Sequence, residues 1–162
     1  MAVFRRANDA YAQGFAKGEL PMRARTDVAI VTCIDSRVDP AHFLSLDEGA
    51  AYVFRNAGGR ITDDVLRSLL ITQVLGCRRV MVIHHTECGL NRFTNDGLRE
   101  RIHQELGLDA SQVDFLPYAD LEQSARDDVA RLRDSSAIRK DVSITGHVYD
   151  VKSGRMHDVT TL

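Results

Sequence analysis

Two cysteines and one histidine stand in the sequence at spacings that suit a single metal ion. His85 and Cys88 lie three positions apart in a short loop segment, so an imidazole and a thiol can point at one ion, and Cys33 can supply a third ligand. Two cysteines and one histidine that leave a fourth position for water are typical of catalytic zinc, whereas structural zinc is normally closed by a fourth protein ligand. Thiolates also favour zinc over magnesium or calcium. The pattern therefore predicts a catalytic zinc site.

These two segments alone support another interpretation equally well. Cys33 and Cys88 could be small buried residues, and His84 and His85 could simply end a strand. His84 is the other candidate ligand, but it shares a strand face with two valines. We therefore predict that His84 is packed inside the protein or lies behind the metal ligands.

An acidic and a basic residue directly follow the first candidate ligand. Asp35 and Arg37 stand two and four positions after Cys33. Arginine can pair with a carboxylate through two parallel N–H donors, which would keep Asp35 ionised and directed away from the metal. The alternative is an ordinary solvated ion pair at the surface. Next to a metal-binding cysteine, we prefer the catalytic interpretation.

The candidate ligands follow segments that read as strands of a parallel sheet. The residues from Asp27 to Cys33 form a short β-branched run without helical period, which is typical of a buried strand. Further strands are expected at 50–54, 79–84 and 142–151, and a turn at 152–154 leads to a short hairpin end. A helical turn is expected to begin at Pro40. Helices are expected at about 95–106 and 118–132, and after Thr62 as N-cap, with an apolar face at Val65, Leu66, Leu69, Leu70 and Val74.

Strands that alternate with helices predict an α/β fold. We expect a mainly parallel central sheet, with about four parallel strands and a C-terminal edge strand, flanked by helices. Ligands of such sheets bind beyond the carboxyl ends of the strands, where the strand order reverses. If the strands that end at Cys33 and near His85 are neighbours at that reversal, the topology brings the candidate ligands together.

Composition excludes several classes of protein. The chain of 162 residues fits one domain, 1–162, and its net charge of −2 with scattered basic residues offers no surface for nucleic acid. No apolar stretch approaches the roughly 20 residues needed to span a bilayer, and the N-terminal segment does not read as a secretory signal. Three cysteines without a signal argue against disulfides and for a cytoplasmic location, with Cys77 as a buried spare.

Three motifs together resemble those of the beta-class carbonic anhydrases. They are C-x-D-S-R at 33–37, R-N-A-G-G at 55–59 and H-x-x-C-G at 85–89, in the order and at the spacing of that family. The resemblance extends from the first strand to the last. Nucleotide-binding glycine motifs, the alternative for a parallel sheet, are absent from the sequence.

The resemblance implies a zinc enzyme, with one ion per subunit, that reversibly hydrates carbon dioxide to bicarbonate and a proton by means of a zinc-bound hydroxide. Asp35 would accept the proton of that hydroxide in a hydrogen bond, and Arg37 would hold Asp35. The amide of Gly89 would contact bicarbonate, with Ser36 and Gly59 beside it. The family also implies a state in which Asp35 becomes a fourth zinc ligand. We further expect Gly58, Gly59 and Gly89 to allow close passage of the backbone, or simply to form turns.

The resemblance also carries expectations about assembly and alternatives. It implies a homodimer or a dimer of dimers with an N-terminal helical arm, for which residues 1–20 qualify, although an amphipathic helix on its own subunit fits the periodicity equally well. Arg55 and Asn56 could line the site or contact another subunit. The chain lacks Trp, so we expect no Trp-containing inhibitory bicarbonate pocket. The same metal site also suits hydrolysis of carbonyl sulfide or carbon disulfide. A non-catalytic zinc or redox-sensing module is the remaining alternative.

Overall fold

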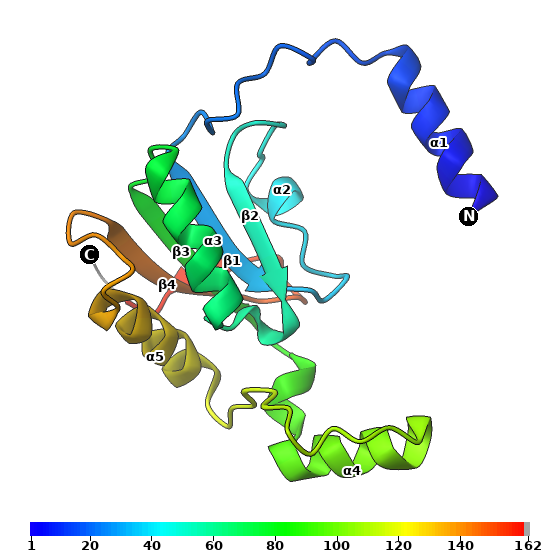
Figure 1. Ribbon diagram of the computed structural model, residues 1–162, viewed down its shortest axis with the longest axis vertical. Coiled ribbons are helices and arrows are strands. Elements are labelled where there is room, and N and C mark those ends of the chain that lie inside the picture. Colours follow the sequence, from blue (N-terminus) through cyan, green and yellow to red (C-terminus); the bar gives the residue numbers. More distant parts are fainter. Residues whose placement is uncertain (161–162) are drawn as a thin grey trace.

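The computed structural model describes residues 1–160. Its centre is a five-stranded sheet, and Figure 1 shows the helices arranged around it. The strand order is β2-β1-β3-β4-β5. The first four strands in this order are parallel to their neighbours, and β5 runs antiparallel to β4. The predicted α/β fold with a C-terminal edge strand is therefore confirmed.

The elements alternate along the chain as the sequence predicts. The strands are β1 Val28–Cys33, β2 Tyr52–Asn56, β3 Arg79–His85, β4 Ser143–Tyr149 and β5 Met156–Asp158. The α-helices are α1 Ala2–Gln13, α2 Pro40–Phe43, α3 Asp63–Val74, α4 Asn95–Leu106 and α5 Leu121–Asp134, and two short 3-10 turns are η1 Ala57–Gly59 and η2 Gly89–Arg92. In this described part of the chain, no helix has the length and apolar character needed to cross a bilayer.

The core lies between one face of the sheet and the helices α3 and α5 (Figure 1). Strand side chains from β1, β3 and β4 pack there against Leu69 of α3 and Leu132 of α5, both of which are fully buried. This packing fixes the inner strands β1 and β3 side by side. Their carboxyl ends are therefore held together at one edge of the sheet.

The buried face of α3 differs from the expected one. Val65 and Leu69 are buried, but Leu70 and Val74 are 46% and 87% exposed. Instead, Thr72 and Gln73 complete the inner face, and their side chains donate hydrogen bonds to the carbonyl of Leu69. The prediction was wrong at these positions because polar side chains that satisfy nearby carbonyls can occupy core-facing positions of a helix.

The N-terminal helix α1 stands away from the sheet (Figure 1). None of its residues is buried, and Phe4 is 70% exposed. Its region is tied to the rest of the chain at Glu48, which accepts a hydrogen bond from Tyr11 at 3.0 Å and pairs with Lys17. In this structure the apolar side chains of α1 are thus not packed on the sheet of their own chain.

Candidate metal centre

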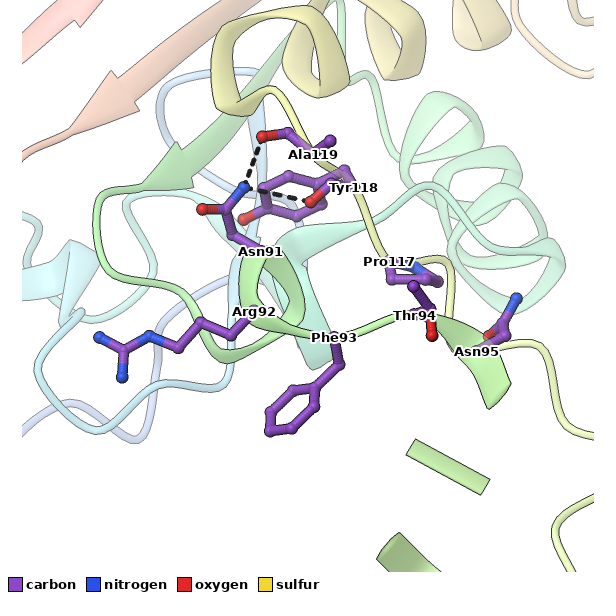
Figure 2. A pocket seen from close by; sticks show the side chains of 8 residues that line it. All are labelled: Asn91, Arg92, Phe93, Thr94, Asn95, Pro117, Tyr118 and Ala119. Carbon is purple, nitrogen blue, oxygen red and sulfur yellow. Dashed lines mark hydrogen bonds between the residues drawn. The ribbon is translucent and has the colours of Figure 1, made fainter. Parts of the chain in front are cut away.

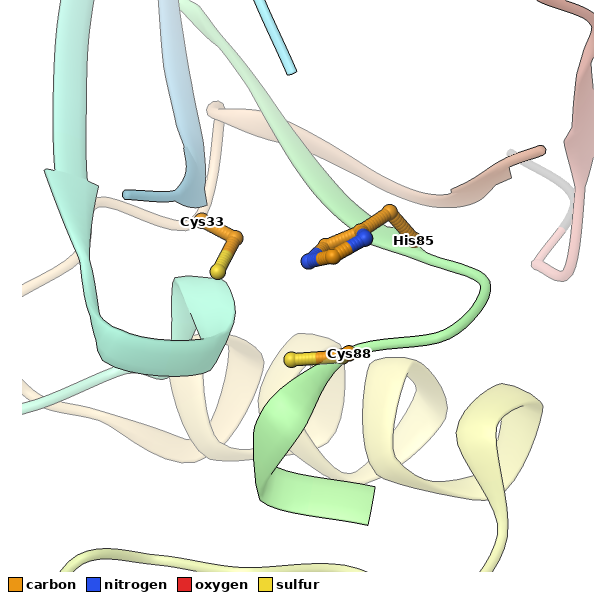
Figure 3. A group of neighbouring side chains, drawn as sticks. All are labelled: Cys33, His85 and Cys88. Carbon is orange, nitrogen blue, oxygen red and sulfur yellow. The ribbon is translucent and has the colours of Figure 1, made fainter. Parts of the chain in front are cut away.

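The three candidate ligand side chains meet at the carboxyl ends of β1 and β3 (Figure 3). Cys33 is the last residue of β1 and His85 the last residue of β3, and Cys88 follows just before η2. Their ligand atoms lie within 4.8 Å of one another, and all three residues are buried. Strand β1 pairs with β2 on one side and β3 on the other, so the strand order reverses here. As expected, the three residues converge at the point where the strand order reverses.

The buried imidazole of His85 has one nitrogen with a partner and one without. Nδ1 lies 2.9 Å from the carbonyl oxygen of Thr86, which can only accept, so Nδ1 carries the proton and Nε2 presents a lone pair. In the described part of the chain, Nε2 is buried without a hydrogen-bond partner. A buried acceptor without a partner is costly, whereas metal coordination satisfies it. The donor set therefore fits a metal ion that prefers sulfur and nitrogen.

The two thiols are hydrogen-bonded to each other, and the sulfur of Cys33 also accepts hydrogen bonds from the backbone. Cys33 Sγ accepts from the amides of Asp35 and Gly58 at 3.4 Å and 3.3 Å. The hydrogen bond between the thiols is the largest cause that raises the pKa of Cys33 and lowers the pKa of Cys88, so Cys88 is the first of the pair to ionise. Cys88 is thus the member of the pair that is prepared to ligate a cation as thiolate.

Glycine suits two of the three expected positions, Gly59 because the backbone passes close to it and Gly58 because of its left-handed conformation. A Cβ on Gly59, where φ is +68°, would lie 2.9 Å from the Thr32 carbonyl carbon and 3.0 Å from the Cys33 nitrogen. A Cβ on Gly58, where φ is +75°, would lie 2.6 Å from the Leu90 side chain. Gly89 has open space around its Cβ position, so its expected steric role is not supported. The turn η1 therefore packs directly on the end of β1.

The carboxylate of Asp35 is held beside the ligands by Arg37. Arg37 donates from Nε to Oδ1 at 3.0 Å and from Nη2 to Oδ2 at 2.8 Å, and its backbone amide also reaches Oδ1 at 2.9 Å. The Arg37 hydrogen bonds hold the pKa of Asp35 well below its usual range, despite partial burial. Oδ2 lies 3.9 Å from His85 Nε2. An ionised acceptor therefore faces the space between the ligand atoms.

Arg55, which the sequence left between two roles, holds the backbone of the first ligand segment. It donates from Nε to the Cys33 carbonyl at 3.0 Å and from Nη2 to the Asp35 carbonyl at 2.8 Å. The neighbouring Asn56 donates to the Arg60 carbonyl at 2.7 Å. The spacing of residues in the sequence does not predict long-range contacts of this kind. Only its place in the R-N-A-G-G motif drew attention to Arg55.

His84 lies outside the ligand cluster, in a buried polar network. Its Nδ1 is 2.7 Å from Ser124 Oγ and its Nε2 is 3.2 Å from Asp128 Oδ2. Asp128 also pairs with Arg60 at 2.7 Å, and Tyr118 stacks on the His84 ring with centroids 5.7 Å apart. As predicted, His84 is a packed residue. Its network fastens α5 to the strand that ends in the ligand His85.

The remaining expected site residues lie around the cluster without a shown contact to a ligand molecule. Ser36 and Gly89 are exposed, and Gly59 is buried against the backbone of Thr32 and Cys33. Their roles in substrate binding stay predictions. Cys77 is fully buried in the main core, as expected of a structural residue.

An open hollow lies next to η2 (Figure 2). Its volume is about 380 Å³, and it is formed by η2 and segments 93–95 and 117–119. Asn91 closes one side by donating to the carbonyls of Tyr118 and Ala119 at 3.1 Å and 2.9 Å. Tyr118 belongs both to this wall and to the apolar cluster that surrounds Cys33 and Cys88. One residue thus joins the hollow to the surroundings of the thiols.

Comparison with known proteins gives one consistent result. The family model described as carbonic anhydrase matches residues 28–156. Beta-carbonic anhydrase 1 of Mycobacterium tuberculosis is 40% identical over 153 residues, with 93% of this chain and 91% of the relative covered. A carbon disulfide hydrolase of Acidianus sp. is 34% identical over 151 residues, with 78% and 74% covered.

Solved structures agree with the sequence comparison. The crystal structure of a carbonic anhydrase from Streptococcus mutans superposes with a TM-score of 0.93 at 46% identity, and it covers 98% of this chain and 96% of its own. The family match spans the ligand-bearing strands and the sheet edge on which the three ligands meet. The chain therefore belongs to the beta-carbonic anhydrase family.

Proposed function

We propose that the protein catalyses the reversible, zinc-dependent hydration of carbon dioxide to bicarbonate and a proton. The observation that carries this proposal is the placement of three buried ligand atoms within 4.8 Å beside an ionised carboxylate. The family match and the 40% identical beta-carbonic anhydrase support the same activity. A purely structural zinc site would not need the adjacent Asp35–Arg37 pair.

Cys33, His85 and Cys88 would hold one zinc ion per subunit. The fit rests on the lone pair of His85 Nε2, which is buried without a hydrogen-bond partner among residues 1–160, and on the hydrogen-bonded thiols of Cys33 and Cys88. When bound, zinc lowers the pKa of a coordinated water to about 7, the value established for carbonic anhydrases, and so supplies a nucleophile at neutral pH. Three protein ligands leave the fourth position open for this chemistry.

The chain's own residues would orient the reaction. Because Asp35 is ionised, it can only accept hydrogen bonds. It would therefore accept a hydrogen bond from the O–H of the attacking nucleophile, so that a lone pair of the nucleophile's oxygen faces the carbon of the substrate. Arg37 keeps Asp35 in this orientation. The amide of Gly89, with Ser36 and Gly59 nearby, is our proposed contact for bicarbonate.

Hydrolysis of carbon disulfide or carbonyl sulfide is the second candidate activity. The 34% identical carbon disulfide hydrolase of Acidianus sp. favours it. These molecules are linear like carbon dioxide, and the same nucleophile and ligands would serve all three. We propose carbon dioxide as the substrate in the first place because the more similar of the two relatives named above is a carbonic anhydrase.

We also propose a homodimer or dimer of dimers, in which α1 packs on a neighbouring copy. The exposed apolar side chains of α1 and the exposed Leu70 and Val74 of α3 support this assembly, because apolar surface of this kind favours association. A cytoplasmic location is proposed from the three free cysteines. The partners are then small molecules and further copies of the chain, with no nucleic acid or membrane.

The test is carbon dioxide hydration by stopped flow on protein of known zinc content, with both sulfur substrates assayed on the same sample. Hydration that is lost in Asp35→Asn with zinc retained supports the proposal. If the protein contains zinc but turns over only the sulfur compounds, carbon dioxide is not its substrate. Protein without zinc that still folds and binds a partner would favour the non-catalytic module.

A further inference from the structure

Glu87 stands between the two ligands of the H-x-x-C motif but is not one of them. Its carboxylate and its backbone carbonyl both contact Arg37: Arg37 Nη1 donates to Oε2 and Nη2 donates to the carbonyl oxygen, each at 3.2 Å. Glu87 has φ +57°, a conformation that is uncommon outside glycine. A side chain kept at such a position, next to a site, points to a function for that side chain.

The contacts of Arg37 divide between two segments of the chain. Its Nε and Nη2 hold Asp35, and its Nη1 and Nη2 hold Glu87. Asp35 and Arg37 belong to the same turn, so their mutual pair fixes neither relative to His85 or Cys88. Glu87 is the residue that ties the planar guanidinium to the loop of these ligands. Because the guanidinium is rigid, anchoring one edge also sets the direction of the other edge.

A second cation holds Glu87 from the opposite side. Lys152 Nζ lies 2.6 Å from Oε1, the carboxylate oxygen that Arg37 does not use. Lys152 comes from the turn between β4 and β5, and this turn is fastened to the ligand loop by Thr86, whose hydroxyl donates to Asp150 at 3.0 Å and accepts from the Val151 amide at 3.1 Å. The Glu87 carboxylate therefore lies between two cations, and the turn that carries Lys152 is hydrogen-bonded to the loop of the candidate ligands.

We propose that Glu87 is a positioning residue that sets the direction of the Asp35 carboxylate through Arg37, with Lys152 as its anchor. This inference rests on the proposed function, since Asp35 acts there on the attacking nucleophile. Glu87 does not touch the substrate or the metal in this scheme. It sets the position of the Asp35 carboxylate, the proposed acceptor of the nucleophile's O–H, relative to His85 and Cys88.

The first test compares Glu87→Gln with wild type at equal zinc content. The amide keeps the size of the side chain but removes its charge, and Arg37 and Glu87 are 45% and 35% exposed. Exposed charge networks contribute modestly, so we expect kcat/KM for carbon dioxide hydration to fall about fivefold. Asp64→Asn, which breaks the exposed Asp64–Arg67 pair of α3, is the control and keeps wild-type activity.

The second test separates positioning from support of the loop. In an Arg37→Lys background, Glu87→Gln should cause no further loss, because the two residues act in series; losses that multiply would overturn the proposal. The Arg37 Nε–H signal in ¹H–¹⁵N NMR spectra, assigned by its disappearance in Arg37→Lys, should broaden or shift in Glu87→Gln. An unchanged signal with unchanged kcat/KM would also overturn it.

Two further outcomes keep the test decisive. If Glu87→Gln loses zinc, the same measurements on Lys152→Met replace it, since Lys152 lies outside the ligand loop; an unaltered Arg37 signal and unaltered activity there would refute the anchoring. If wild-type protein with bound zinc hydrates no carbon dioxide, the proposed function fails. The NMR comparison of Arg37 would then still decide whether Glu87 orders the guanidinium.

Discussion

Among substitutions that add a single methyl group at the metal centre, we expect Gly59→Ala to lower the free energy of unfolding most. The added Cβ would lie 2.9–3.0 Å from main-chain atoms of Thr32 and Cys33, which cannot move without shifting the end of β1. A left-handed conformation costs a non-glycine residue about 1–2 kcal/mol, and overpacking costs about 1–3 kcal/mol. We therefore expect a loss of about 2–5 kcal/mol in the free energy of unfolding.

The matched control is Gly89→Ala, which adds the same methyl group to the same site. Its Cβ meets no atom within 4 Å and its N–H is retained, so we expect a change within about 0.5 kcal/mol. Urea unfolding with excess chelator measures both variants without the contribution of bound zinc. Competition with a chromophoric chelator then measures zinc affinity, which should fall only for Gly59→Ala.

The refuting result is equally clear. If Gly59→Ala unfolds at the same urea concentration as Gly89→Ala, the end of β1 yields without cost, and the close packing of η1 does not position Cys33. For a chain of this length, a loss of about 3 kcal/mol should lower Tm by roughly 6–12 °C. Thermal unfolding in chelator gives an independent check of the urea result.

Three other predictions follow from the site. Arg37→Ala should raise the pKa of Asp35 toward about 4, its value in an unfolded chain. In wild type the ionised carboxylate stabilises the fold above about pH 4, and this stabilisation is lost as the pH falls toward the depressed folded-state pKa; in the variant the two pKa values nearly coincide, so the contribution is absent at every pH. ¹³C NMR titration of the carboxyl measures the pKa, and an unmoved pKa would contradict the pairing. Cys88→Ser should lose zinc while Cys77→Ser keeps it, which elemental analysis checks, and equal zinc in both would remove Cys88 from the ligand set. Deletion of residues 1–20 should lower the number of subunits per particle, determined by light scattering from the molar mass divided by that of the shortened chain, because α1 buries none of its side chains within its own chain; an unchanged number of subunits would refute the arm.

The sheet and its ligand edge could be predicted because their signals are local. The β-branched run before Cys33 has no helical period, and the strand formed there ends at Cys33. The helix expected at 95–106 has those bounds, because Thr94 caps its start and Gly107, at φ +66°, ends it. Strand-end ligands then converge through topology, without knowledge of any side-chain contact.

Other features depend on tertiary contacts that spacing does not encode. The start of helix α5 is a local exception, because the helix begins not near Tyr118 but at Leu121, where the Asp120 side chain caps it by accepting from the Gln123 amide. The contact of Arg37 with Glu87 joins residues 50 positions apart, and the two flank a site that sequence motifs describe only through its ligands. The same limit applies to the inner face of α3, where polar side chains replaced the expected apolar ones.

The position of the ligands along the chain has a consequence for how the protein is made. All three precede residue 89, whereas α5, β4 and β5 come later, and β1 pairs directly with β3. At a synthesis rate of about 5–20 residues per second, residues 89–162 alone take roughly 4–15 s to be synthesised. During that interval a nascent chain already carries every donor, and we expect it to capture zinc before translation ends. Chains arrested after residue 120 should therefore protect both thiols from alkylation when zinc is supplied, and equal alkylation with and without zinc would place metal uptake after release from the ribosome.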